Sequence, residues 1–304
     1  MSQTFVSPSF VLNPAKSLEQ AIVETLSYSD VFDYPLTFDE LHKYLVISVS
    51  KEEIKDCLEN TTQINFSEGY YFLLGRDEIV QTRLSREKKS QPVFKRALVY
   101  GNIISRFPFV KMVALTGSLA MLNLSNEIDM DFMLITKPNR LWLARAFAVT
   151  FGRIMRLIGD RICINLLISE NALHWKDHDL YSAREISQMI PISGLRIYND
   201  FRVANLWTQE FLPNAIIQKT NNTESKSFLH QIFELPLLGK LGDWIENQVM
   251  KFQLKIIAKN FGDGKETKFT SDICQGNFHQ HKKWTMKQYE ERLSLLHPPS
   301  SADD

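Results

Sequence analysis

Two short motifs in the middle of the chain combine residue types that serve phosphoryl transfer. The first is the turn Thr116-Gly117-Ser118, which follows the apolar segment Val110 to Leu115. Glycine lets the backbone approach a ligand closely, serine adds a donor, and free N–H groups at a helix start bind phosphate readily. The second motif is Asp129-Met130-Asp131, whose acids share one face of an expected strand because side chains alternate along it. Mg²⁺ prefers carboxylate and phosphate oxygens, so it is the natural cation between these acids.

Gly117, Ser118, Asp129 and Asp131 together match the signature of the DNA polymerase β-like nucleotidyltransferase superfamily, which the chain resembles over about residues 110–168. The resemblance implies an α/β core in which two Mg²⁺ ions bridge Asp129, Asp131 and the triphosphate of an NTP. An acceptor hydroxyl then attacks the α-phosphorus in line and pyrophosphate leaves. The alternative is an ordinary turn followed by two acids at an exposed strand end. The apolar residues around the acids indicate a buried strand and disfavour that alternative.

Further site residues follow from position along the chain. Arg140 comes directly after the acid-bearing strand and is the best basic candidate for a phosphate contact. The residues predicted to bind the nucleotide phosphates are Thr116, Gly117, Ser118 and Arg140.

Asn165 is the point at which the chain departs from its apparent family. The family completes its metal site with a third acid on a later strand, and Arg161 to Ile168 is the next strand expected here. The polar residue on the axis of that strand is Asn165, which can coordinate a metal through its carbonyl but cannot act as a general base. The predicted catalytic set is therefore Asp129, Asp131 and Asn165, with Asp129 and Asp131 as the metal ligands.

Composition limits the class of protein. The chain has 304 residues, with 35 Lys plus Arg balanced by 35 Asp plus Glu, so no global charge directs it to nucleic acid or anionic lipid. No apolar run is long enough to span a membrane, and Met1 to Phe5 lacks the features of a secretory signal. Three scattered cysteines form neither a disulfide framework nor a metal motif. We expect no membrane association and a cytoplasmic location.

The N-terminal part is expected to contain a winged-helix-like domain. Helical spacing begins at Leu18, and Thr37 to Glu40 and Ser50 to Glu53 are capping boxes that predict two more helices. Ile64 to Phe66 and Tyr70 to Leu74 then predict a β-hairpin. The third helix is net acidic, so DNA binding through this domain is not favoured over a structural or docking role.

The rest of the chain completes the predicted fold, an α/β core with an N-terminal winged helix and a helical C-terminal domain. Arg140 to Ile158 predicts a crossover helix, and Gly239 to Asn260 a long amphipathic helix. The predicted parts are a flexible arm (1–16), the winged-helix-like domain (17–84), the nucleotidyltransferase core (85–170), the helical domain (171–296) and a disordered tail (297–304).

Two functions remain open from the sequence. The first is a Mg²⁺-dependent enzyme that transfers a nucleoside monophosphate from an NTP to the hydroxyl of a small molecule, an RNA or a protein. The second is a nucleotide-binding regulatory protein with weak chemistry and a winged helix that binds DNA or another partner. The paired acids favour the enzyme, and Asn165 favours the regulator.

Overall fold

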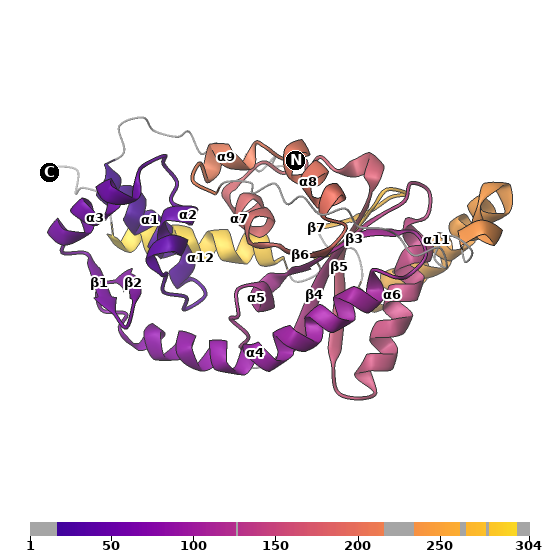
Figure 1. Cartoon of the computed structure of the whole chain (residues 1–304), viewed down its shortest axis with the longest axis horizontal. Helices are drawn as coiled ribbons and strands as arrows, with labels where there is room; N and C mark the ends of the chain where they lie inside the picture. Colours follow the sequence, from indigo (N-terminus) through magenta and orange to yellow (C-terminus); the bar gives the residue numbers. More distant parts are fainter. Residues whose placement is uncertain (1–16, 126, 216–233, 262–265, 278–279, 297–304) are drawn as a thin grey trace, which may run out of the picture.

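One mixed six-stranded sheet forms the centre of the protein. The computed structural model describes residues 17–125, 127–215, 234–261, 266–277 and 280–296 (Figure 1). The strands run in the order β6-β3-β4-β5-β8-β7, and every neighbouring pair is antiparallel except β4 and β5, which are parallel. Their bounds are β3 Val110–Thr116, β4 Asp129–Thr136, β5 Arg161–Ser169, β6 Ile190–Ser193, β7 Glu266–Phe269 and β8 Ile273–Asn277.

The two faces of the sheet are covered by different helices because its apolar side chains alternate between the faces. Met112 and Met133 pack with the N-terminal helices and with α7, α8 and α12, whereas Val113 and Phe132 pack with α4, α6 and α11. The acids of β4 alternate with Met130, which lies in the second cluster, so Asp131 belongs to the first face. The helix bounds are α4 Glu78–Ile104, α6 Leu141–Arg156, α7 Leu180–Gln188, α8 Leu195–Ala204, α11 Gly239–Phe261 and α12 His281–Leu296.

An N-terminal module of three helices and a β-hairpin lies at one end of the molecule (Figure 1). Both predicted capping boxes are confirmed, Thr37 with Glu40 and Ser50 with Glu53. A bridge between Leu36 and Tyr71 extends the hairpin by one backbone pairing. The bounds are α1 Leu18–Asp30, α2 Phe38–Tyr44, α3 Lys51–Asn60, β1 Ile64–Ser67 and β2 Tyr70–Leu73.

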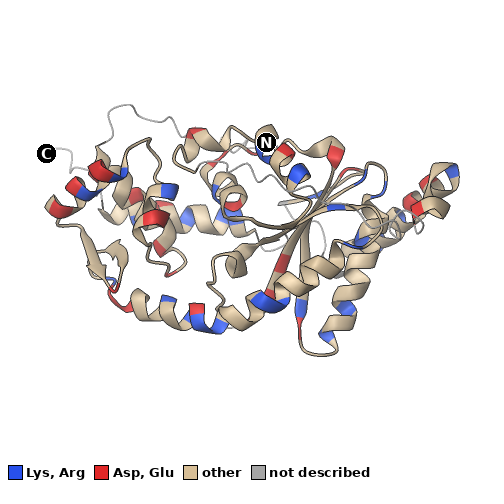
Figure 2. Cartoon of the chain, viewed as in Figure 1, with Lys and Arg blue, Asp and Glu red and all other residues tan. Residues whose placement is uncertain are grey.

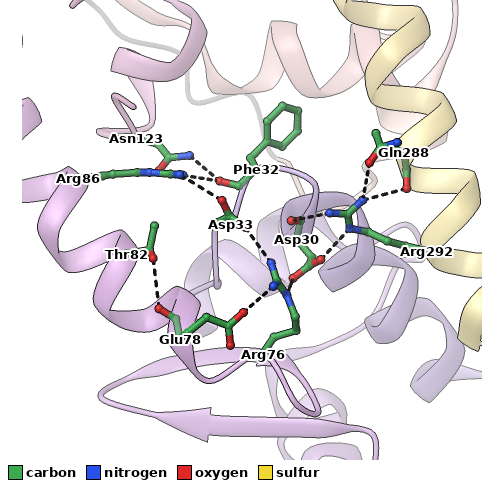
Figure 3. Close-up of polar contacts among 10 residues, drawn as sticks. All are labelled: Asp30, Phe32, Asp33, Arg76, Glu78, Thr82, Arg86, Asn123, Gln288 and Arg292. Atoms are coloured by element: carbon green, nitrogen blue, oxygen red, sulfur yellow. Dashed lines mark hydrogen bonds and ion pairs between the residues drawn. The ribbon is translucent and has the colours of Figure 1, made fainter. Parts of the chain in front are cut away.

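A charged network fastens this module to the rest of the chain (Figure 3). The buried carboxylate of Asp30 accepts hydrogen bonds from Arg76 Nε and from Arg292 Nε of α12, both at 2.7 Å. Asp33 binds Arg76 at 2.8 Å and Arg86 of α4 at 3.1 Å. Charge-assisted bonds to a buried carboxylate are strong, so residues far apart in sequence are held to the end of α1.

The predicted division into domains needs two corrections. α4 runs through residues 84 and 85 without a break, so no linker separates the predicted winged-helix-like domain from the core. The region 171–296 is not purely helical, because β6, β7 and β8 join the central sheet. The helix that follows the turn is a single short one, α5 at Gly117–Ala120. The predicted arm and tail lie outside the described residues.

None of the helices within the described ranges combines the length and apolar character that crossing a bilayer requires.

Replacing Asp30 with asparagine tests the charged network. The change leaves Arg76 and Arg292 without their shared carboxylate, and we expect the free energy of unfolding to fall by about 2–4 kcal/mol in a urea titration, as for a partly buried ion pair that loses one partner. Lys51→Met is the matched control, because it removes an exposed ion pair with Asp39 and should change stability far less than Asp30→Asn does. Equal effects of the two substitutions would contradict a central role for Asp30.

Candidate functional site

Asp129 and Asp131 open strand β4 and lie on the same face of the sheet. Both side chains are partly exposed, whereas Met130 between them is fully buried on the opposite face. Arg161, at the start of the parallel neighbour β5, pairs with Asp129 through Nε at 3.0 Å and with the exposed Glu127 through its terminal nitrogen at 2.6 Å. The acid pair therefore begins a strand whose remainder is buried in the core, which fixes both carboxylates on a rigid support.

The turn at Gly117 lies directly against Asp131. Thr116 is the backbone partner of Asp131 in the β3–β4 ladder, and its hydroxyl donates to the Asp131 carbonyl at 3.3 Å. Gly117 has φ +65°, and a Cβ added there would lie 2.5 Å from Asp131 Oδ2. Only glycine fits this conformation and this approach without strain. The two sequence motifs are therefore parts of one site.

Ser118 and the start of α5 present unused donors at this turn. No side chain caps α5, and the Ser118 hydroxyl is exposed and has no partner among the described residues. The first N–H groups of a helix have no acceptor within the helix. Gly117 and Ser118 thus place backbone and hydroxyl donors at the turn beside Asp131, whereas the Thr116 hydroxyl is already bonded to the Asp131 carbonyl. Phosphate binding by Thr116, Gly117 and Ser118 stays a prediction.

Asn165 lies at a shift of register between β4 and β5. Ile164 pairs with Phe132 and Leu166 pairs with Met133, so Asn165 is an extra residue in its strand. Its Nδ2 donates to Asp131 Oδ1 at 2.6 Å, and its Oδ1 accepts from the thiol of Cys163 at 2.7 Å. The structure thus places Asn165 beside Asp131 and puts an exposed cysteine at the same rim.

The electrostatics of the site centre on Asp131. Burial and the charge of Asp129 raise the pKa of Asp131 to about 6, against the opposing effects of the Asn165 hydrogen bond and the Arg161 charge. Local desolvation of the Cys163 thiol, together with the charges of Asp131 and Asp129, raises its pKa to about 12, although the residue as a whole is exposed. Desolvation is the larger cause of both pKa shifts, and the negative charges of the acid pair add to it, a contribution that a bound cation would relieve.

Glu185 of α7 is a further acid at this site that the sequence reasoning missed. Burial and the charge of Asp131 raise the pKa of Glu185 to about 7, and Gln188 donates to its carboxylate at 2.6 Å. No motif surrounds Glu185 in the sequence. Only the packing of α7 on the face of the sheet that carries the acids brings it near Asp131.

Arg140 does not join the other site residues. It follows the end of β4, whereas Asp129 and Asp131 lie at the start, and its guanidinium is almost fully buried. The side chain donates to the Leu237 carbonyl at 2.9 Å and pairs with Asp243 of α11 at 2.7 Å. The structure therefore does not bring Arg140 to the acid pair, and this arginine instead joins α6 to α11 at the opposite end of the strand.

Among the described residues, no three or more His, Cys, Asp or Glu side chains form a group that could hold a metal ion. A cation at Asp129 and Asp131 would complete its coordination with oxygens of other kinds, from the Asn165 amide, water or a phosphate. Comparison of the chain with models of protein families, with curated proteins and with solved structures finds no match.

The raised pKa of Asp131 predicts a specific dependence of stability on pH. Between the ordinary pKa of 3.8 and about 6 the folded protein binds more protons than the unfolded chain, so the free energy of unfolding should fall as pH rises through this window. Asp131→Asn removes this effect, and above pH 7 without metal it should be the more stable protein by up to roughly 3 kcal/mol. Urea titrations from pH 4 to pH 8 measure the difference. A wild-type-minus-variant difference that stays constant with pH would contradict the assigned pKa.

Proposed function

We propose that this protein is a Mg²⁺-dependent nucleotidyltransferase of the DNA polymerase β-like kind, with a winged-helix-like N-terminal module, acting in the cytoplasm. It would transfer a nucleoside monophosphate from an NTP to an acceptor hydroxyl and release pyrophosphate. The observation that carries the proposal is the contact of Gly117 with Asp131, because it joins a phosphate-binding turn and a carboxylate pair into one site. Neither motif alone would support a specific reaction.

The residues present suit Mg²⁺ bound together with the triphosphate. Asp129 and Asp131 supply hard oxygen ligands, and Asn165 supplies an amide oxygen once its side chain turns over. The bound metal would stabilise charge on the entering and leaving oxygens. The backbone at Gly117 and the Ser118 hydroxyl would hold the β- and γ-phosphates, and Arg161 orients Asp129 through their ion pair.

Glu185 is our candidate for the proton acceptor that Asn165 cannot be. A pKa of about 7 is suited to general base catalysis at neutral pH, because the group is partly ionised and still accepts a proton readily. Gln188 donates a hydrogen bond to its carboxylate. Glu185 lies on α7, which packs on the face of the sheet that carries the acid pair.

A regulatory protein that binds nucleotide with little chemistry is the second candidate, favoured by the amide at position 165. DNA recognition by its N-terminal module has little support. Figure 2 shows both charge signs on α3, and the acids Glu52, Glu53, Asp56 and Glu59 outnumber its two lysines. One of those lysines, Lys51, is already paired with Asp39. Such a surface does not favour contact with DNA phosphates.

Isotope labelling tests the proposed reaction. The full-length protein is incubated with each of the four NTPs, Mg²⁺ and a cell extract that contains candidate acceptors. We expect label from the α-phosphate, but not from the γ-phosphate, to become covalently attached to an acceptor. Asp129→Asn and Asp131→Asn should abolish the transfer, because each removes a metal ligand.

Glu127→Gln is the matched control, since Glu127 precedes the acid pair but is exposed and bound only to Arg161 among the described residues. This variant should retain activity. Full activity in Asp131→Asn would refute the transferase assignment. Tight Mg²⁺–NTP binding without any transfer would favour the regulatory candidate.

Glu185→Gln tests the proposed proton acceptor. The turnover rate should fall by roughly 10²–10⁴, typical for loss of a positioned general base, while NTP affinity is retained. The wild-type rate should rise with pH through about 7 as Glu185 ionises, and the variant should lose this rise. A variant that keeps both the wild-type rate and the wild-type pH profile would exclude Glu185 from the chemistry.

A further inference from the structure

Three basic side chains, Lys43 of α2, Arg184 of α7 and Arg202 of α8, converge where the N-terminal module meets the helices on the sheet. Lys43 Nζ lies 4.9 Å and the Arg184 guanidinium 4.4 Å from the centre of the same Tyr44 ring, and Arg202 donates to the Ile186 carbonyl of α7 at 3.0 Å. Within the part of the chain that the structure describes, none of the three forms an ion pair with a carboxylate. We call these three residues the cation cluster.

The two arginines of the cation cluster are buried and incompletely bonded. Arg184 is 4% exposed and Arg202 is 5% exposed, and the Nε of each has no hydrogen-bond partner. Arg184 lies over the rings of Tyr28 and Tyr44 at 4.7 and 4.4 Å, and it donates only one long bond, of 3.5 Å, to the Thr25 carbonyl. The buried hydroxyl of Ser187 on α7 also has no partner. Donors of this kind are normally satisfied, so these atoms indicate a missing acceptor.

Lys43 faces the same charges. Burial, the charge of Arg202 and the charge of Arg184 lower the pKa of Lys43, with Glu40 opposing them. Glu40 cannot neutralise the cluster, because its two oxygens already accept from Arg83 at 2.7 and 2.9 Å. Glu185, next in sequence to Arg184, forms no ion pair with it and accepts instead from Gln188.

Buried like charges without a counterion are strongly unfavourable, and they persist where a ligand supplies the opposite charge. Arginine presents several donors in a planar fork that matches phosphate oxygens, and lysine adds a point charge. A phosphate dianion would supply the acceptor that Arg184, Arg202 and Ser187 lack and the opposite charge that Lys43 lacks. We propose that the cation cluster and Ser187 form a binding site for a phosphate group, separate from the turn at Gly117. The argument stands on these contacts alone and does not depend on the proposed transferase activity.

Inorganic phosphate without Mg²⁺ is the probe, with sodium chloride of equal ionic strength as the reference. Calorimetry on the full-length protein should show saturable phosphate binding. Lys43→Met and Arg202→Gln should each weaken it by about tenfold or more, since each removes a charge-assisted contact. The matched controls are Lys55→Met on α3 and Arg196→Gln on α8, two exposed side chains, and both variants should bind phosphate as the wild type does.

Two further readouts keep the test decisive if a variant fails to fold. In the wild-type protein, phosphate should protect Lys43 from acetylation, measured by mass spectrometry, and should leave Lys55 unprotected. Asp131→Asn should bind phosphate as the wild type does, which separates this site from the acid pair. Absence of phosphate binding above the chloride reference, or equal protection of Lys43 and Lys55, would overturn the proposal.

Discussion

The structure must hold the Asp131 carboxylate, a charged group, at the start of a strand that is otherwise buried. Asp129 lies on the same face and repels it, while Asn165 donates a hydrogen bond that partly compensates. Gly117 leaves just enough room for the carboxylate because it has no side chain. The site is therefore preformed but electrostatically unsatisfied, and this is the state in which a cation and a triphosphate gain most by binding.

The surroundings of the acids follow from the alternation of β4. Because Asp131 lies on the face that the N-terminal module and α7 cover, the acid pair, Glu185 and the cation cluster all belong to one side of the sheet. The network around Asp30 fastens α12 and the N-terminal module together over this side. Tyr34 of the module donates to the Met121 carbonyl at 3.1 Å, just after the phosphate turn. A movement of the module would therefore shift the segment that follows the phosphate turn.

Sequence reasoning succeeded where local chemistry decides structure. Capping boxes located α2 and α3, and apolar runs located β3, β4 and β5 with the acids on a common face. It failed where long-range packing decides. β6 is a four-residue strand that contains Pro191, and β7 and β8 lack apolar alternation, so only pairing with the sheet makes them strands. For the same reason the sequence pointed to Arg140, which lies away from Asp131, and missed Glu185, which lies near it. Strand direction and helix packing decide both positions.

The most direct test of a shared Mg²⁺–NTP site uses Cys163, the exposed thiol bonded to Asn165 at the rim of the acid pair. Its alkylation at pH 9 is followed by mass spectrometry, with Cys57 of α3 as the internal reference. The account predicts that Mg²⁺ and NTP together slow alkylation of Cys163 severalfold by covering the thiol. Mg²⁺ alone should not slow it, because a cation beside the acids lowers the pKa of the thiol, and Asp131→Asn should abolish the protection. Unchanged alkylation of Cys163 at saturating Mg²⁺ and NTP would contradict it.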